Sequence, residues 1–262
     1  MIRSHRRSIA ARLLVLARVF AHVLVCLLVA AALFPHWNDQ RRQAAIRRWS
    51  RRLLSILRVR IRRVKVSKHL PERCLLVLNH LSWVDVLLLS SLHPAKFVAK
   101  AEIARWPLLG LLARRVGTVF IERGSRSAAR RTNEHISAAL ASGQPVACFP
   151  EGTTSLGHGV LRFHGALFQP AIDSGAVVQP VALRYVDAGG RQSESSAYVG
   201  DDSLIDSLWR IISHPPVTGE LNFLDAVDAS GWDRRSLANS LHDEIARALQ
   251  SAPARRQLRK AG

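Results

Sequence analysis

Acidic residues are almost absent from the first 70 residues of this 262-residue chain. That stretch contains 17 lysines and arginines but one acid, Asp39, whereas the rest contains 21 basic and 18 acidic side chains. Most of the net charge of +19 therefore belongs to the N-terminal segment. A nucleic-acid-binding domain would carry its basic residues on the folded domain, so this distribution argues against nucleic acid as a partner. Because the basic segment is also strongly apolar, it favours an anionic lipid surface instead.

Cysteine is also scarce. The chain has three cysteines, Cys26, Cys74 and Cys148, and each lies in an apolar run. This small odd number excludes a framework of disulfides, and we expect buried, reduced thiols, as in a domain that faces the cytoplasm. Internal repeats and low-complexity linkers are absent too, so the length indicates one α/β domain with a small appendage.

An apolar run of 22 residues, Leu13–Phe34, is interrupted by Arg18 and His22. As a helix it would be about 33 Å long, enough to cross about 30 Å of hydrocarbon. The uninterrupted part covers only residues 23–34, so a tilted or half-inserted helix is the alternative. A cleaved signal peptide would need small residues at the cleavage site, which Pro35-His36-Trp37 does not supply.

A basic amphipathic helix is predicted next, over residues 41–59. Apolar residues, Trp49 among them, recur there at near-helical spacing, with seven arginines around them. Such a helix is typical of segments that lie at lipid headgroups. Basic residues flank the apolar run on both sides, which conflicts with a simple positive-inside argument for a full span. We therefore expect residues 1–59 to form two membrane-associating helices that enter and leave one leaflet.

Short apolar runs replace the helical pattern from residue 60 onward. Residues 61–66 alternate as an edge strand would, and five further runs read as strands: 74–78, 96–99, 118–121, 146–149 and 177–183. Helical patterns cover 84–92, 108–115, 127–141, 203–212 and 233–251, and 220–227 is a possible last strand. This alternation predicts an α/β fold with a mixed, largely parallel sheet flanked by helices. The domain would span residues 60–251, followed by a basic tail, 252–262.

One polar cluster, Asn79-His80-Leu81-Ser82-Trp83-Val84-Asp85, stands between a predicted strand and a predicted helix. This is where α/β folds usually place their chemistry. If the chain turns sharply, Asp85 can accept one imidazole N–H of His80. That contact would fix the tautomer and leave the other nitrogen free to take a proton from an alcohol. The alternatives are a pair that merely caps the helix and a metal site, for which no second histidine stands at ligand spacing.

Three further clusters end or interrupt predicted strands. Phe149-Pro150-Glu151-Gly152-Thr153-Thr154-Ser155 is either an anion-binding turn or an ordinary one. Gly117-Thr118-Val119-Phe120-Ile121-Glu122-Arg123 ends in an arginine that either grips phosphate or is simply solvated. In Val178-Gln179-Pro180-Val181-Ala182-Leu183 a proline interrupts a strand and marks an edge or a bend.

Together these four clusters resemble the glycerolipid acyltransferase family, best known for the 1-acylglycerol-3-phosphate acyltransferases. The family's signatures are Asn-His-x-x-x-x-Asp, Gly-x-x-Phe-x-x-Arg, Phe-Pro-Glu-Gly-Thr and Val-x-Pro-Val, and all occur here in the family's order within residues 74–183. The resemblance implies the family's α/β fold, a two-helix N-terminal membrane motif and acyl transfer to a lipid hydroxyl. The acyl donor would be acyl-CoA or acyl-carrier protein as co-substrate, with no cofactor, metal or covalent enzyme intermediate.

The resemblance also implies roles for individual residues. His80 would be the general base and Asp85 its orienting partner. Substrate would be bound by a larger set: Asn79, Lys100, Arg123, Glu151, Gly152, Thr153 and Thr154. We therefore expect a lysolipid O-acyltransferase of the inner membrane, with its catalytic domain on the cytoplasmic side. The alternative is an inactive basic scaffold with the same fold, against which the intact His80–Asp85 pair argues.

The sequence departs from the phosphate-accepting members of this family. Their turn usually reads Glu-Gly-Thr-Arg-Ser, with a downstream Phe-Lys, and here Thr154 and His164 stand at the two cationic positions. Each lost charge-assisted hydrogen bond would cost about 1.5–3 kcal/mol of binding to a phosphate. This form of the turn resembles the branch that acylates lyso-ornithine lipid, an aminolipid without phosphate. Otherwise Arg162 supplies the charge from another position, and lysophosphatidate is the acceptor.

Overall fold

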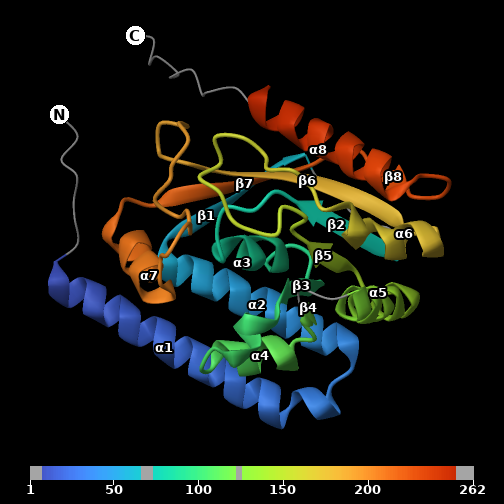
Figure 1. Cartoon of the computed structure of the whole chain (residues 1–262). Helices are drawn as coiled ribbons and strands as arrows, with labels where there is room; N and C mark the ends of the chain where they lie inside the picture. Colours follow the sequence, from blue (N-terminus) through green and yellow to red (C-terminus); the bar gives the residue numbers. More distant parts are fainter. Residues whose placement is uncertain (1–7, 66–72, 122–125, 252–262) are drawn as a thin grey trace.

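Two antiparallel helices begin the structure, a computed structural model that describes residues 8–65, 73–121 and 126–251 (Figure 1). These helices, α1 (Ile9–Ala32) and α2 (Asp39–Leu57), are joined by the short 3-10 helix η1 (Phe34–His36). Ser8 and Asn38 begin them, because their side-chain oxygens accept backbone N–H groups three residues later. Arg58, in the left-handed conformation, ends α2 and leads directly into the first strand.

The described residues form one sheet of eight strands in the order β1-β7-β6-β2-β5-β3-β4, with β8 beside β6. The strands are β1 (Val59–Lys65), β2 (Cys74–Leu78), β3 (Lys96–Lys100), β4 (Val119–Ile121), β5 (Val146–Cys148), β6 (Val177–Val186), β7 (Val217–Phe223) and β8 (Val227–Asp228). The pairs of β6 with β7 and with β8 are antiparallel, and the other five pairs are parallel. The predicted mixed, largely parallel sheet is therefore confirmed, with β1 at an edge as expected.

Helices cover both faces of the sheet (Figure 1). Besides α1 and α2, the described α-helices are α3 (Val84–Ser90), α4 (Leu109–Arg115), α5 (Arg126–Ala141), α6 (Gln169–Ser174), α7 (Leu204–Ser213) and α8 (Arg234–Gln250). Two further 3-10 helices are η2 (Ala101–Arg105) and η3 (Gly165–Phe168). One hydrophobic core lies between the sheet and α2, α3 and α7, and a second lies between the opposite face and α5, α6 and α8. The carboxyl ends of β2, β5, β3 and β4 consequently lie along one edge of the sheet.

Helix α2 belongs to the protein core, and this corrects one expectation. Its apolar residues Leu53, Leu54, Ile56 and Leu57 are buried in the first core. Trp49, predicted to face lipid headgroups, instead stacks on Phe34 with ring centroids 5.4 Å apart. The apolar side of α2 is thus used to bind the domain, and exposed arginines lie on its outer side.

Helix α1 has two apolar sides with different environments. One side, including Val23, Cys26, Leu27 and Ala30, is buried against the rest of the protein. The other side exposes a set of large apolar residues, Leu13, Leu14, Phe20, Val25 and Leu28. Within the described residues α1 is the one helix that is long and apolar enough to cross a membrane. So large an exposed apolar surface is typical of a lipid or protein contact.

Pro180 stands inside the sheet. Strand β6 lies between β2 and β7, so of the two predicted alternatives, an edge or a bend, the edge is excluded. Its missing N–H falls where β6 changes partners, because Val177 and Val178 pair with β8 and residues from Val181 onward pair with β7. The Pro180 carbonyl still accepts the N–H of Leu224 at 3.0 Å. The predicted last strand, 220–227, is correspondingly divided between β7 and β8.

Candidate active site

His80 and Asp85 meet at the carboxyl end of β2. The loop after β2 turns sharply into α3, and Asp85 lies in the first turn of that helix. Nδ1 of His80 lies 2.8 Å from Oδ2 of Asp85. The Asp85 carboxyl is fully buried, whereas the His80 side chain keeps 19 % of its surface exposed. The sharp turn predicted from the sequence therefore exists, and Nε2 is the ring nitrogen left for a substrate.

The Asp85 carboxylate accepts three more hydrogen bonds. The backbone N–H groups of Leu81 and Ser82 donate to Oδ2 at 2.7 and 2.9 Å. The hydroxyl of Tyr185, on β6, donates to Oδ1 at 2.7 Å. The orientation of the Asp85 carboxyl is thereby fixed from several sides.

Asn79 has a different task from the predicted substrate contact. Its buried side-chain amide donates to the carbonyl of Leu183 at 2.9 Å, and its Oδ1 accepts the Leu183 N–H at 2.8 Å. These two bonds continue the ladder between β2 and β6 beyond the end of β2. Asn79 therefore fixes where the His80 loop sits on the sheet.

Glu151 joins the two loops of the site. Its Oε1 accepts the backbone N–H of His80 at 2.7 Å, and its Oε2 accepts that of Leu161 at 3.0 Å. Burial raises the pKa of Glu151 to about 7, although these two N–H donors partly oppose the rise. Both carboxyl oxygens of Glu151 are thus engaged with backbone, and the contact that the structure shows for this side chain is with the two loops of the site.

The turn after Glu151 wraps around the His80 loop. Gly152 adopts a left-handed conformation, with φ of 67°, that favours glycine. The N–H of Ser155 donates to the His80 carbonyl at 2.9 Å. The hydroxyl of Thr154 donates to the backbone carbonyl of Tyr198, so it is turned towards protein. Thr153, by contrast, is exposed and remains available to a substrate.

Of the two basic residues predicted to bind substrate, Lys100 and Arg123, the structure describes only Lys100. Lys100 ends β3 and is exposed. Because β3 runs parallel to β5, with Phe97 opposite Ala147, Lys100 reaches the edge of the sheet where the Glu151 turn begins. Arg123 lies outside the described residues, and so does the predicted basic tail. In the ranges that the structure describes, no group of three or more His, Cys, Asp or Glu side chains could hold a metal ion.

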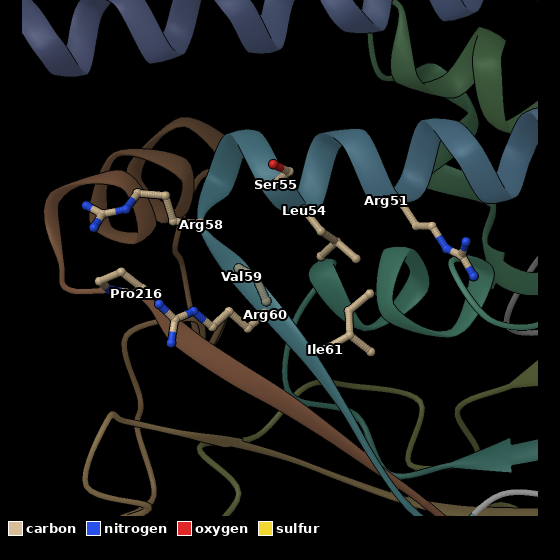
Figure 2. Close-up of a pocket in the computed structure, with 8 residues that line it drawn as sticks. All are labelled: Arg51, Leu54, Ser55, Arg58, Val59, Arg60, Ile61 and Pro216. Atoms are coloured by element: carbon tan, nitrogen blue, oxygen red, sulfur yellow. The ribbon is translucent and has the colours of Figure 1, made fainter.

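A pocket of about 400 Å³ lies at the junction of α2 and β1 (Figure 2). Arg58 and Arg60 lie on either side of Pro216, whereas Arg51 points towards α3, where its Nε donates to the Ser91 carbonyl at 2.9 Å. The arginine side chains do not converge on one point. We therefore assign no ligand to this pocket.

Comparison with known proteins places this geometry in context. Residues 61–184 match the acyltransferase family. A 1-acyl-sn-glycerol-3-phosphate acyltransferase of Neisseria gonorrhoeae is 42 % identical over 67 % of this chain and 69 % of its own. A lyso-ornithine lipid O-acyltransferase of Pseudomonas aeruginosa is 37 % identical over 84 % of both chains. The crystal structure of the 1-acyl-sn-glycerophosphate acyltransferase PlsC from Thermotoga maritima has the same fold, with a TM-score of 0.65 at 21 % identity, covering 92 % of this chain and 99 % of that one.

Proposed function

The chain belongs to the acyltransferase family, whose relatives here acylate lysolipids, and we propose that His80 is the general base of that reaction. The observation that carries this role is the 2.8 Å contact between His80 Nδ1 and the buried Asp85 carboxylate. It leaves Nε2 as the nitrogen that can accept a proton. An inactive scaffold would gain nothing from a buried carboxylate held by four donors beside a partly exposed histidine.

The reaction follows from this geometry. Nε2 of His80 takes the proton of the lysolipid hydroxyl while the hydroxyl oxygen attacks the carbonyl carbon of an acyl thioester. The new C–O bond forms, the C–S bond breaks, and the leaving thiolate takes the proton back from the imidazolium. Asp85 keeps Nδ1 protonated and stabilises the positive charge of the intermediate imidazolium. We infer acyl-CoA or acyl-carrier protein as the thioester, and the reaction needs no further cofactor.

The N-terminal helices support a location on the inner membrane, with the catalytic domain on the cytoplasmic side. Helix α1 exposes a long apolar surface, and arginines lie on the outer side of α2. Apolar insertion and attraction to anionic lipid act together in such segments. The three cysteines are free and buried, which suits a reducing compartment. We propose that α1 is the anchor and that α2 with residues 60–251 forms the catalytic body.

The acceptor that we favour is a lysolipid without phosphate, such as lyso-ornithine lipid. The Thr154 hydroxyl is occupied by the Tyr198 carbonyl, and the exposed His164 stands where phosphate-accepting members carry a lysine. Lysophosphatidate is the second candidate, because two relatives, 42 % and 38 % identical, are named for acylating it. Exposed Lys100 and Arg162 could serve its phosphate.

The test is an acyl-transfer assay with the purified full-length protein in detergent or vesicles. Lysophosphatidate and lyso-ornithine lipid are offered side by side, each with acyl-CoA and with acyl-carrier protein, and products are identified by mass spectrometry. We expect transfer by the wild type and none by His80→Ala, whose circular dichroism and membrane binding stay unchanged. Near-normal turnover in His80→Ala would exclude the mechanism. A wild type without activity on all four combinations would favour the scaffold.

A further inference from the structure

Tyr185 is the one side-chain donor to Asp85, other than His80, in the described part of the chain. Its hydroxyl lies 2.7 Å from Oδ1, the carboxylate oxygen that His80 does not contact. Tyr185 and Asp85 are both fully buried, so the phenol cannot touch a substrate. Any effect of Tyr185 on the chemistry must therefore pass through Asp85.

The fold brings Tyr185 to Asp85 by a definite register. Leu183 and Tyr185 point to the same face of β6, because side chains two residues apart in a strand share a face. The two hydrogen bonds between Asn79 and Leu183 fix β6 against the His80 loop. With Leu183 held there, Tyr185 is placed beneath the first turn of α3. The contact is thus built into the sheet and does not depend on a mobile loop.

We propose that Tyr185 is a positioning residue for the His80–Asp85 pair, in that its hydroxyl fixes the Asp85 carboxylate through Oδ1. This inference rests on the function proposed above for His80. Oδ2 then remains aligned with Nδ1 while the imidazole gains and loses its positive charge. Without the phenol, the carboxylate could rotate about its Cβ–Cγ bond and would lose one of the donors that stabilise its charge.

The phenol remains a donor throughout the working range of pH. Burial and then the negative charge of Asp85 raise the pKa of Tyr185 well above its usual range. The other titratable groups of this cluster are His80 and Glu151, and Glu151 reaches the site through the backbone N–H of His80. A change of the tyrosine hydroxyl therefore acts on the charge of Asp85 first.

The first test is Tyr185→Phe in the full-length protein, which removes the hydroxyl and keeps the ring. We expect kcat to fall about tenfold, as for one lost hydrogen bond to a charged group, with KM for both substrates unchanged. The acidic limb of the pH profile should move to higher pH, because a carboxylate with one donor fewer attracts the protonated imidazole more strongly. Tyr198→Phe is the matched control, since the described residues give the Tyr198 hydroxyl no hydrogen bond. Tyr198→Phe should leave kcat and the position of the acidic limb at their wild-type values.

A double-mutant cycle separates positioning from a general packing effect. If Tyr185 acts through Asp85, Tyr185→Phe should lower the rate in the wild type but not in an Asp85→Asn background. Equal losses in both backgrounds would overturn the proposal, as would an unchanged kcat or a change confined to KM. The proposed function itself is judged by His80→Ala. If that variant is inactive and Tyr185→Phe is normal, only the role of Tyr185 is wrong.

Fluorotyrosine provides a second test that keeps the hydroxyl in place. The chain has two tyrosines, so in the Tyr198→Phe protein Tyr185 is the single position at which fluorotyrosine is incorporated. The more acidic phenol donates a stronger hydrogen bond, and the acidic limb should move to lower pH, opposite to the effect of Tyr185→Phe. A profile that stays in place, or that moves to higher pH, would overturn the proposal even if Tyr185→Phe failed to fold.

Discussion

The imidazole of His80 lies flat against the phenyl ring of Phe149, with centroids 3.8 Å apart and planes 13° apart. Phe149 stacks in turn on Phe97, with centroids 6.1 Å apart. The imidazole is thus held on one face by Phe149 and at its edge by Asp85. Rotation of the ring would break both contacts. This restraint keeps Nε2 in one direction, which is the preorganisation that proton transfer between bound groups requires.

Asp85→Asn should reduce kcat by about a hundredfold or more, because an amide can present its N–H to Nδ1 and stabilise the wrong tautomer. KM should change little, since the buried Asp85 does not reach substrate. Initial rates at saturating substrate provide the measurement. The matched control is Asp243→Asn, an exposed carboxyl on α8, which should keep the wild-type rate. A loss below tenfold in Asp85→Asn would mean that another group orients the imidazole.

Glu151→Gln should change how stability depends on pH. The folded-state pKa of about 7 exceeds the ordinary value of 4.5, so between these values the folded protein holds a proton that the unfolded chain has lost. The contribution of Glu151 to stability is therefore fully present below pH 4.5 and is lost as the pH rises through 7.

Because glutamine does not titrate, the Tm of Glu151→Gln should rise relative to the wild type between pH 4.5 and pH 8. Thermal unfolding at intervals across this range is the measurement, with the exposed Glu102→Gln as the control. A constant difference in Tm at all pH values would show that Glu151 carries no proton in this range.

Two truncations should behave differently. Removal of residues 1–37 takes away α1 and leaves α2 with its Asn38 cap. We expect a folded protein that no longer floats with vesicles of anionic phospholipid. High salt should not release the full-length protein, because apolar insertion is not screened as charge attraction is.

Removal of residues 1–58 should instead prevent folding. It deletes four buried core residues, Leu53, Leu54, Ile56 and Leu57, and a large buried side chain contributes about 2–5 kcal/mol. Circular dichroism and vesicle flotation of both truncations provide the measurement. If the protein that lacks residues 1–58 still unfolds cooperatively, α2 is dispensable for the core.

Thr154→Arg combined with His164→Lys should move the preference towards lysophosphatidate. One restored charge-assisted bond corresponds to about a tenfold or larger gain in kcat/KM for that acceptor. Thr154→Val is the control, because it removes the contact with the Tyr198 carbonyl without adding a charge. A wild type that already prefers lysophosphatidate would refute the importance of Thr154 and leave the acyltransferase activity unaffected.

Sequence patterns predicted the elements whose signals are local. Strand β2 has the predicted bounds, and α5 and α8 differ from prediction by a residue at their ends. The His80–Asp85 contact was also within reach, because both residues lie in one turn between a strand and a helix. Short-range spacing decides such features, and the chain shows them directly.

Features that depend on distant partners could not be predicted in the same way. Tyr185 reaches Asp85 across 100 residues, and no local spacing reveals that contact. The apolar side of α2 has the same composition whether it meets lipid or the sheet, so its burial could be decided only by the fold. The same holds for Glu151, whose bond to His80 spans 71 residues. In sequence it looked like part of an anion-binding turn.

The pairing of β1 with β7 has a consequence for the order in which the molecule is completed. Val59 lies opposite Val217, so this edge of the sheet joins an early strand to a late one. The core beneath α2 likewise includes Leu221 and Phe223. Contacts between residues so distant in the chain form slowly, since a long loop must close first. A ribosome therefore makes α2 and β1 first, but their places in the domain can be filled only after residue 223 has been synthesised.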